Sequence, residues 1–197
     1  MNTKFNKILI VVIAAAAILS AASACFALAT AGVNVKASVP ALAQSLALVI
    51  NSVDPATGAF TTATEVNFGT LTFDSVFQIF RASKFFAIDA VVTDNSGAVW
   101  TLTHTVSAFQ KDATSNIGGN VNVSFVQLLS GVETLLDKKS FTNSNNKAIS
   151  KTLLGNGSLR IYYGVATGLG DDDEVTPITV LTSAGSYLGT ITLTLTP

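Results

Sequence analysis

The closing stretch of the chain, YLGTITLTL at residues 187–195, decides the fold. Apolar side chains alternate there with threonines, and a period of two is typical of a β-strand with one buried face. The threonine face suits the solvent side of an antiparallel sheet. We therefore predict a closing strand whose inward side chains include Tyr187, Ile191, Leu193 and Leu195.

The same period recurs upstream of this strand. Further strands are predicted at residues 33–39, 46–50, 65–73, 85–93, 99–109, 121–129 and 159–165. A turn is predicted at residues 51–58, a hairpin-type turn at 94–97 and a polar loop at 137–150. Residues 75–84 and 128–136 show helical spacing but also fit a strand plus a turn. Many short strands separated by turns predict an all-β fold, a single antiparallel β-sandwich.

Composition excludes several classes of protein. Of 197 residues, 49% are hydrophobic and 12% are charged, which excludes a disordered tail protein. The formal net charge is −1, from 11 Lys+Arg against 12 Asp+Glu. Basic residues do not cluster beyond the pair Lys138 and Lys139, so we expect no nucleic-acid partner.

The amino terminus has the parts of a secretory signal peptide. Lys4 and Lys7 precede an apolar run at residues 8–19, and small residues follow it. We predict a signal peptide helix over 1–29, cleaved between 24 and 31, and a secreted, cell-surface protein that meets the membrane only through this helix. A retained anchor is the alternative, although the run is short for a span. Cys25 is then removed, retained or lipidated, depending on the cleavage site.

Groups able to carry catalysis are sparse. The chain has one histidine, His104, within a strand pattern, and a catalytic triad or a zinc site needs partners that the sequence does not place. The acidic run 171–174 is interpreted as a solvated loop, with calcium binding as the alternative. Trp100 is interpreted as a core residue. We predict no enzyme activity, no catalytic or metal-binding residue and no cofactor.

Three segments resemble secreted pilin-like subunits of the spore coat U and archaic chaperone-usher type. AGVNVKASVP at 31–40 is similar to their amino-terminal donor strand, VNFGTL at 66–71 to their V/L-x-F-G strand, and AGSYLGTITLTL at 184–195 to their closing strand. The resemblance implies an Ig/pilin-like sandwich over 41–197, preceded by an extension over 30–40. The usual cysteine pair of that family is missing here.

A second resemblance is to WxL cell-wall-binding domains. GAVWTLT at residues 97–103 looks like their first W-x-L strand. The second such motif would fall at 191–193, where tryptophan is absent.

The pilin resemblance implies polymerisation by strand addition. The extension of one copy would supply a missing strand to the next, and its inserted side chains would be Val33, Val35, Ala37 and Val39. Such a head-to-tail contact does not close, so it makes a fibre. Alternatively, residues 32–40 pair within their own domain, and the sequence leaves both open.

Two functions therefore stand as hypotheses. The first is a non-catalytic extracellular structural protein, a fibre or pilus-like subunit in cell adhesion whose partner is another copy of itself. The alternative is a secreted module that binds cell-wall or other carbohydrate. For the alternative, Tyr162 and Tyr163 are candidates, because only one of two adjacent strand residues can face the core.

Overall fold

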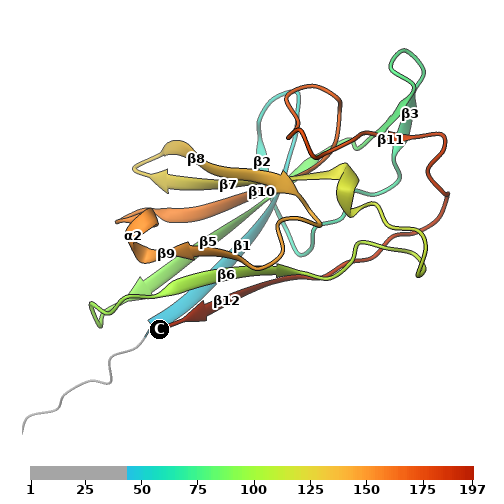
Figure 1. Ribbon diagram of the computed structural model, residues 1–197. Helices are drawn as coiled ribbons and strands as arrows, with labels where there is room; N and C mark the ends of the chain where they lie inside the picture. Colours follow the sequence, from blue (N-terminus) through green and yellow to red (C-terminus); the bar gives the residue numbers. More distant parts are fainter. Residues whose placement is uncertain (1–43) are drawn as a thin grey trace, which may run out of the picture. The chain divides into compact units, whose positions relative to one another are not determined.

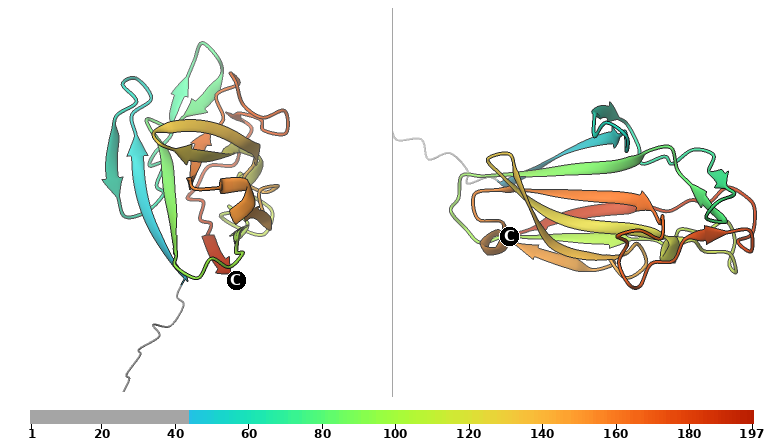
Figure 2. Two further views of the ribbon diagram at one scale, coloured as in Figure 1. Left: turned by 90° about the vertical axis from the view of Figure 1, so that its left-hand side faces the viewer. Right: turned by 90° about the horizontal axis from the view of Figure 1, so that it is seen from above.

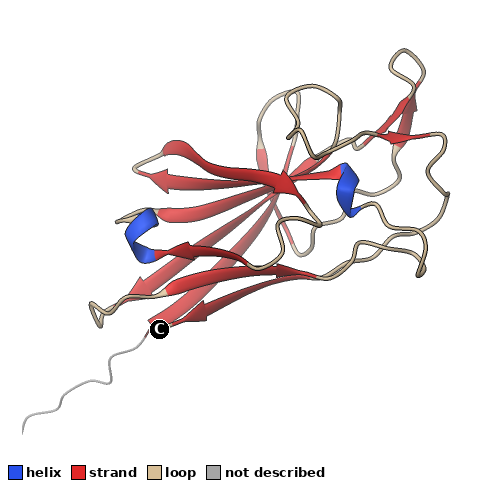
Figure 3. Cartoon of the chain, viewed as in Figure 1, coloured by secondary structure: helices blue, strands red, loops and turns tan. Residues whose placement is uncertain are grey.

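The computed structural model describes residues 44–197, and this part of the chain is all-β with antiparallel pairing throughout (Figure 3). It contains twelve strands, the short 3-10 helix η1 (Gly118–Asn120) and the one-turn helix α2 (Lys151–Leu154). The all-β prediction is confirmed. The predicted signal peptide helix and the extension with Val33, Val35, Ala37 and Val39 lie outside the described residues.

The largest sheet among residues 44–197 has six strands in the order β2-β1-β5-β10-β7-β8 (Figure 1). Their bounds are β1 Gln44–Val53, β2 Phe60–Ala63, β5 Phe85–Asp94, β7 Val121–Leu129, β8 Val132–Ser140 and β10 Ser158–Val165. β5 and β10 lie in the middle, which explains the nearly continuous apolar run of β5 and the strict alternation of buried residues along β10.

A three-stranded sheet packs on the inner face of the large sheet (Figure 2). Within the described chain its order is β12-β6-β9, with bounds β6 Thr101–Val106, β9 Lys147–Ser150 and β12 Ile191–Thr196. Leu102 and Ile149 of this sheet share one core cluster with Phe125, Leu159 and Ile161 of the large sheet. Burial of these aliphatic rows is the main stabilising contribution to the fold.

A second three-stranded sheet lies at one end of the described domain. Its order is β11-β4-β3, with bounds β3 Thr72–Asp74, β4 Ile79–Arg81 and β11 Ile178–Thr179. Ile178 packs there with Ile117 and Val165 in a separate small cluster. The turns that follow β5, β7 and α2 lie at the opposite end of the domain, near the carboxyl terminus (Figure 1).

The strand predicted at 65–73 is wrong for most of its length, because only Thr72–Asp74 pair. The Asn67 side chain accepts a hydrogen bond from the Gly69 amide at 2.9 Å, and Gly69 has φ of 67°. This local turn competes with extended pairing. Val66 and Phe68 still pack against the core from the irregular segment.

Two further predictions are wrong in part, and the structure decides between the alternatives left open for two other segments. The polar run 137–150 is not a loop throughout, since β8 extends to Ser140 and β9 begins at Lys147. An edge strand tolerates such polar residues. The turn at 94–97 is not a hairpin, because β5 and β6 belong to different sheets. For residues 75–84 and 128–136, the strand-plus-turn alternative is confirmed.

His104 forms a buried polar link between the two facing sheets. Its Nδ1 donates to the carbonyl of Ser144 at 2.9 Å, and its Nε2 accepts from the hydroxyl of Tyr163 on β10 at 2.9 Å. The His104 and Phe125 rings meet edge to face, with centroids 5.2 Å apart. Burial lowers the pKa of His104, while the bond to Ser144 acts in the opposite direction. Both ring nitrogens of His104 therefore have hydrogen-bond partners within the core.

Replacing Tyr163 by Phe is expected to destabilise the fold by about 1–3 kcal/mol, because a buried ring nitrogen of His104 loses its donor. Tyr162→Phe is the matched control. Its hydroxyl donates to Glu133 at an exposed position, so its loss costs about 0.5 kcal/mol or less. Denaturant unfolding measures both variants, and equal losses would contradict the cross-sheet link.

Acid is expected to weaken the fold through His104. The folded state disfavours the protonated ring, so the unfolded state binds more protons below the ordinary histidine pKa of 6.5. The free energy of unfolding then falls between pH 6.5 and 5, by up to about 1.4 kcal/mol per pH unit. Denaturant titrations at several pH values should show this decline in the native chain and not in His104→Gln. A decline of the same size in both would exclude His104 as its cause.

Candidate functional site

One edge of β12 carries unpaired backbone groups. Within residues 44–197, β12 pairs with β6 and no described strand lies on its other side. The amide of Ser107 donates to the carbonyl of Thr190 at 2.9 Å, which marks that facing pair as hydrogen-bonded. Antiparallel pairs alternate, so Thr192 and Thr194 also direct their backbone groups to β6. The N–H and C=O groups of Ile191, Leu193 and Leu195 therefore point to the free edge.

The side chains on this edge are incompletely covered. Ile191, Leu193 and Leu195 pack on the core but are half-buried, whereas Leu102 and Ile149 on the neighbouring strands are fully buried. The threonines between them face solvent. Burial of the inward side chains of the three-stranded sheet therefore decreases from β9 and β6 to β12.

The facing strand of the large sheet shows the same deficit. β1 lies beside β5 with Leu48 opposite the buried Ala90, so Leu48 is on the core side. Yet Leu48 is 48% exposed, and its neighbours Leu46 and Ile50 on that face are only half-buried. Two apolar rows, on β1 and on β12, therefore lack a covering layer within the described domain.

Charge distinguishes the β12 edge from the other sheet edges. β8 carries Glu133, Asp137, Lys138 and Lys139, and β9 carries Lys147. Charged residues on edge strands oppose pairing with another chain. β2 is uncharged but only 4 residues long, whereas β12 has 6 residues and the whole run 175–197 is uncharged. Among these edges, β12 is the longest that lacks such protection.

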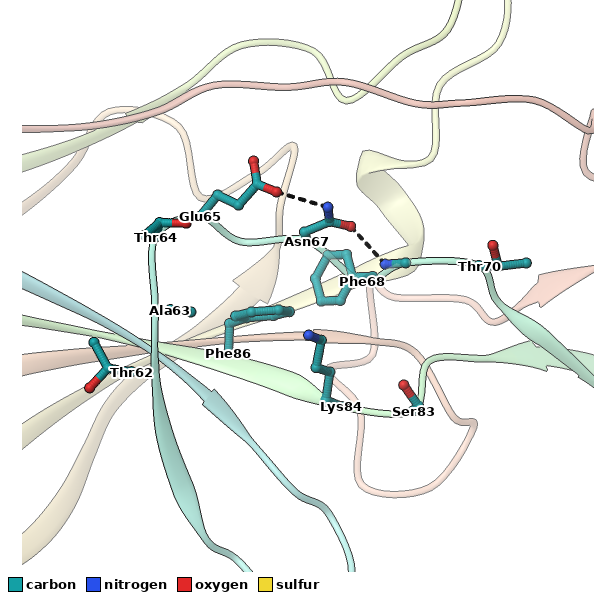
Figure 4. A pocket seen from close by; sticks show the side chains of 11 residues that line it. Thr62, Ala63, Thr64, Glu65, Asn67, Phe68, Thr70, Ser83, Lys84 and Phe86 are labelled. Carbon is teal, nitrogen blue, oxygen red and sulfur yellow. Dashed lines mark hydrogen bonds between the residues drawn. The ribbon is translucent and has the colours of Figure 1, made fainter.

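An irregular segment covers part of the inner face near β2 (Figure 4). It places the Phe68 ring 5.5 Å from Phe86, edge to face, and 6.4 Å from Phe109. A pocket of about 550 Å³ lies beside it, where the Lys84 ammonium stands 5.2 Å from the Phe86 ring centroid. Ala63, which lines this pocket, pairs with Ile50 of β1, so the segment lies beside one end of the apolar row formed by Leu46, Leu48 and Ile50.

Comparisons with protein-family models, with curated proteins and with solved structures find no match. None of the helices within residues 44–197 is long and apolar enough to cross a membrane. In the same part of the chain, no three His, Cys, Asp or Glu side chains are grouped to hold a metal ion.

The sequence-predicted residues divide between core and surface. Ile191, Leu193 and Leu195 lie in β12, whereas Tyr187 precedes the strand and packs in the small cluster with Ile178. Trp100 is a core residue, as predicted, although its Nε1 has no partner among the described atoms. The extension residues Val33, Val35, Ala37 and Val39 are outside the described part.

The acidic run 171–174 is built into a loop. The carboxylate of Asp171 accepts from the backbone amides of Thr167 and Gly168, at 2.8 and 2.6 Å, and from the side chain of Asn122. Glu174 accepts from Asn143 at 2.8 Å. These acceptors are occupied by protein donors, which agrees with the interpretation as a loop.

A charged and aromatic cluster on the outer face of the large sheet is not evident from the sequence. Arg160 bonds Asp89 through two nitrogens, at 2.6 and 2.9 Å, and Glu133 at 2.7 Å. Its guanidinium lies 4.7 Å from the Phe60 ring centroid, and Tyr162 donates to Glu133 at 2.7 Å. Tyr162 thus faces outward and Tyr163 inward, as the period predicted. The strand register brings Arg160 opposite Asp89, a tertiary relation that residue spacing does not contain.

Hydrogen exchange tests the free edge. In a chain lacking residues 30–40, the amides of Ile191, Leu193 and Leu195 should exchange at least about tenfold faster than those of Thr192 and Thr194, which β6 protects. NMR or fragmentation mass spectrometry resolves the alternate positions. Equal slow exchange along β12 in this shortened chain would mean that another group covers the edge.

Proposed function

We propose that the chain is a non-catalytic extracellular structural protein, a β-sandwich subunit of a surface fibre that polymerises by strand addition. In this proposal, residues 33–39 of one copy pair with the free edge of β12 in another. The observation that supports it is an uncharged strand edge flanked by half-buried apolar rows. Main-chain hydrogen bonds would give affinity, and the inserted side chains would give specificity.

The proposed donor has suitable length and pattern. A strand rises about 3.3 Å per residue, so β12 spans roughly 20 Å, and residues 33–39 match that length. Val33, Val35, Ala37 and Val39 project to one face and would lie between Leu48 of β1 and Leu193 of β12. Residues 31–39 contain one charge, Lys36, which would project to solvent with Asn34 and Ser38.

Export supports the same proposal. Lys4, Lys7 and the apolar run 8–19 have the form of a secretory signal, and cleavage between 24 and 31 would free residues 33–39. The chain's only cysteine, Cys25, precedes the domain, so at a surface location the domain would be stabilised by burial and strand pairing without a disulfide.

Two kinds of variant test the proposal. Deleting residues 30–40 removes the donor, and Thr192→Lys with Thr194→Lys places charges on the acceptor edge. Both changes should leave a folded domain that forms no fibres in negative-stain images. The deleted chain lacks the donor, and charged side chains on an edge strand oppose pairing with another strand. Thr134→Lys is the matched control, since Thr134 is an exposed threonine on the edge strand β8. It should assemble like the native protein.

Mixing experiments separate pairing between copies from pairing within one copy. The deleted chain still has a free β12, so it should bind a peptide of residues 31–40, whereas the charged variant should not. Fibres formed by the deleted chain would contradict the proposal. A native protein that stays monomeric but is retained by isolated cell walls would favour the carbohydrate-binding alternative, with Tyr162 and its neighbours on the outer face as the surface to examine.

A further inference from the structure

The end of the domain formed by β3, β4 and β11 exposes large apolar side chains. We define the tip by five of them: Phe73, Val76, Phe77, Val180 and Leu181. Val76 is 82% exposed and Leu181 is 92% exposed. β11 pairs with β4, so the turn that carries Val180 and Leu181 lies beside the β3–β4 hairpin. Clustered exposed apolar side chains on a folded surface mark a contact site.

Hydrogen bonds to Asp74 hold the turn of the β3–β4 hairpin at the tip. The Asp74 carboxylate accepts from the amides of Val76 and Phe77, at 3.0 and 3.2 Å, and from Arg81 Nε at 2.7 Å. The Arg81 guanidinium also lies 4.9 Å from the Phe77 ring centroid. Asp74 and Arg81 are the only charged residues in 72–81, and they pair with each other. Covering the tip would leave no unpaired charge in the hairpin.

The opposite end, the base, is also apolar. It comprises the exposed residues Val99, Leu129, Val132 and Leu153, from the turns after β5 and β7 and from α2. Its acidic Asp94 bonds Lys151 at 2.5 Å. Figures 1 and 2 place these turns and the tip at opposite ends of the domain. Both ends therefore combine exposed apolar side chains with internally paired charges.

The direction of strand addition decides what meets the tip. Ile191 begins β12 on the side of the tip, since Tyr187 just before it packs with Ile178 of β11, and Leu195 pairs with Leu102 near the base. An antiparallel donor would end beside Ile191. Residue 39 and Gln44 are only five positions apart, at most roughly 17 Å of chain. Gln44 lies at the base, because it pairs with Asp94. The base of the donor copy must then lie near the tip of the acceptor.

We propose that the tip of one copy packs against the base of the next copy, as a second contact in the fibre. This inference rests on the proposed strand addition. A parallel donor would instead bring base to base, which favours a closed pair over a repeating head-to-tail fibre. All described pairings in residues 44–197 are antiparallel, in agreement with the orientation that joins tip to base.

The test compares fibres of full-length secreted protein by negative-stain imaging. Val76→Ser with Leu181→Ser should still give fibres, because strand addition holds the copies together, but their persistence length should fall at least twofold. Leu135→Ser is the matched control. Leu135 is 59% exposed on β8, outside both ends, and its variant should keep the native persistence length.

The outcomes separate this inference from the proposed function. Tip-variant fibres as stiff as the native ones, or a Leu135 variant that softens equally, would overturn the tip-to-base contact and leave strand addition intact. A native protein that forms no fibres, or fibres that survive the charges on β12, would overturn strand addition and this inference with it. Thermal unfolding of each variant should match the native domain, since the replaced side chains are exposed.

Discussion

A β-strand has two hydrogen-bonding edges, and β12 uses one of them in the described domain. The consequence reaches the core, because the residues with unpaired backbone groups, Ile191, Leu193 and Leu195, are also those with half-covered side chains. The unused edge of β12 and the exposed Leu48 on the facing sheet are therefore both left uncovered by the described residues. One added strand of alternating apolar residues would satisfy both.

The domain can tolerate these exposed apolar side chains because other core side chains are fully buried. Leu102, Ile149, Leu159 and Ile161 are fully buried where β6 and β9 face β10 and β7. The His104–Tyr163 bond joins the sheets in that same region. The domain thus has a complete half, which keeps it folded, and an open half with apolar edges. Under the proposed function, the subunit would fold first and complete its sheet on assembly.

The local hydrophobic pattern was sufficient to predict a strand where that strand has neighbours on both sides or has one buried face. Alternation along Leu159–Val165 predicted β10, and the run Phe85–Thr93 predicted a central strand. It failed at 65–73, where the Asn67 turn and the positive φ of Gly69 override the apolar period, and at 137–150, where edge strands are polar. The inward row of β12 was predictable from its period. Its free edge was not, because pairing depends on residues distant in the sequence.

The most direct test of the account is a cryo-electron microscopy structure of the assembled secreted protein. The account predicts an extended segment from a second copy beside β12, antiparallel to it, with Val33, Val35, Ala37 and Val39 directed toward Leu48 and Leu193. A structure in which the edge of β12 is bare, or in which residues 33–39 pair with their own domain, would contradict it.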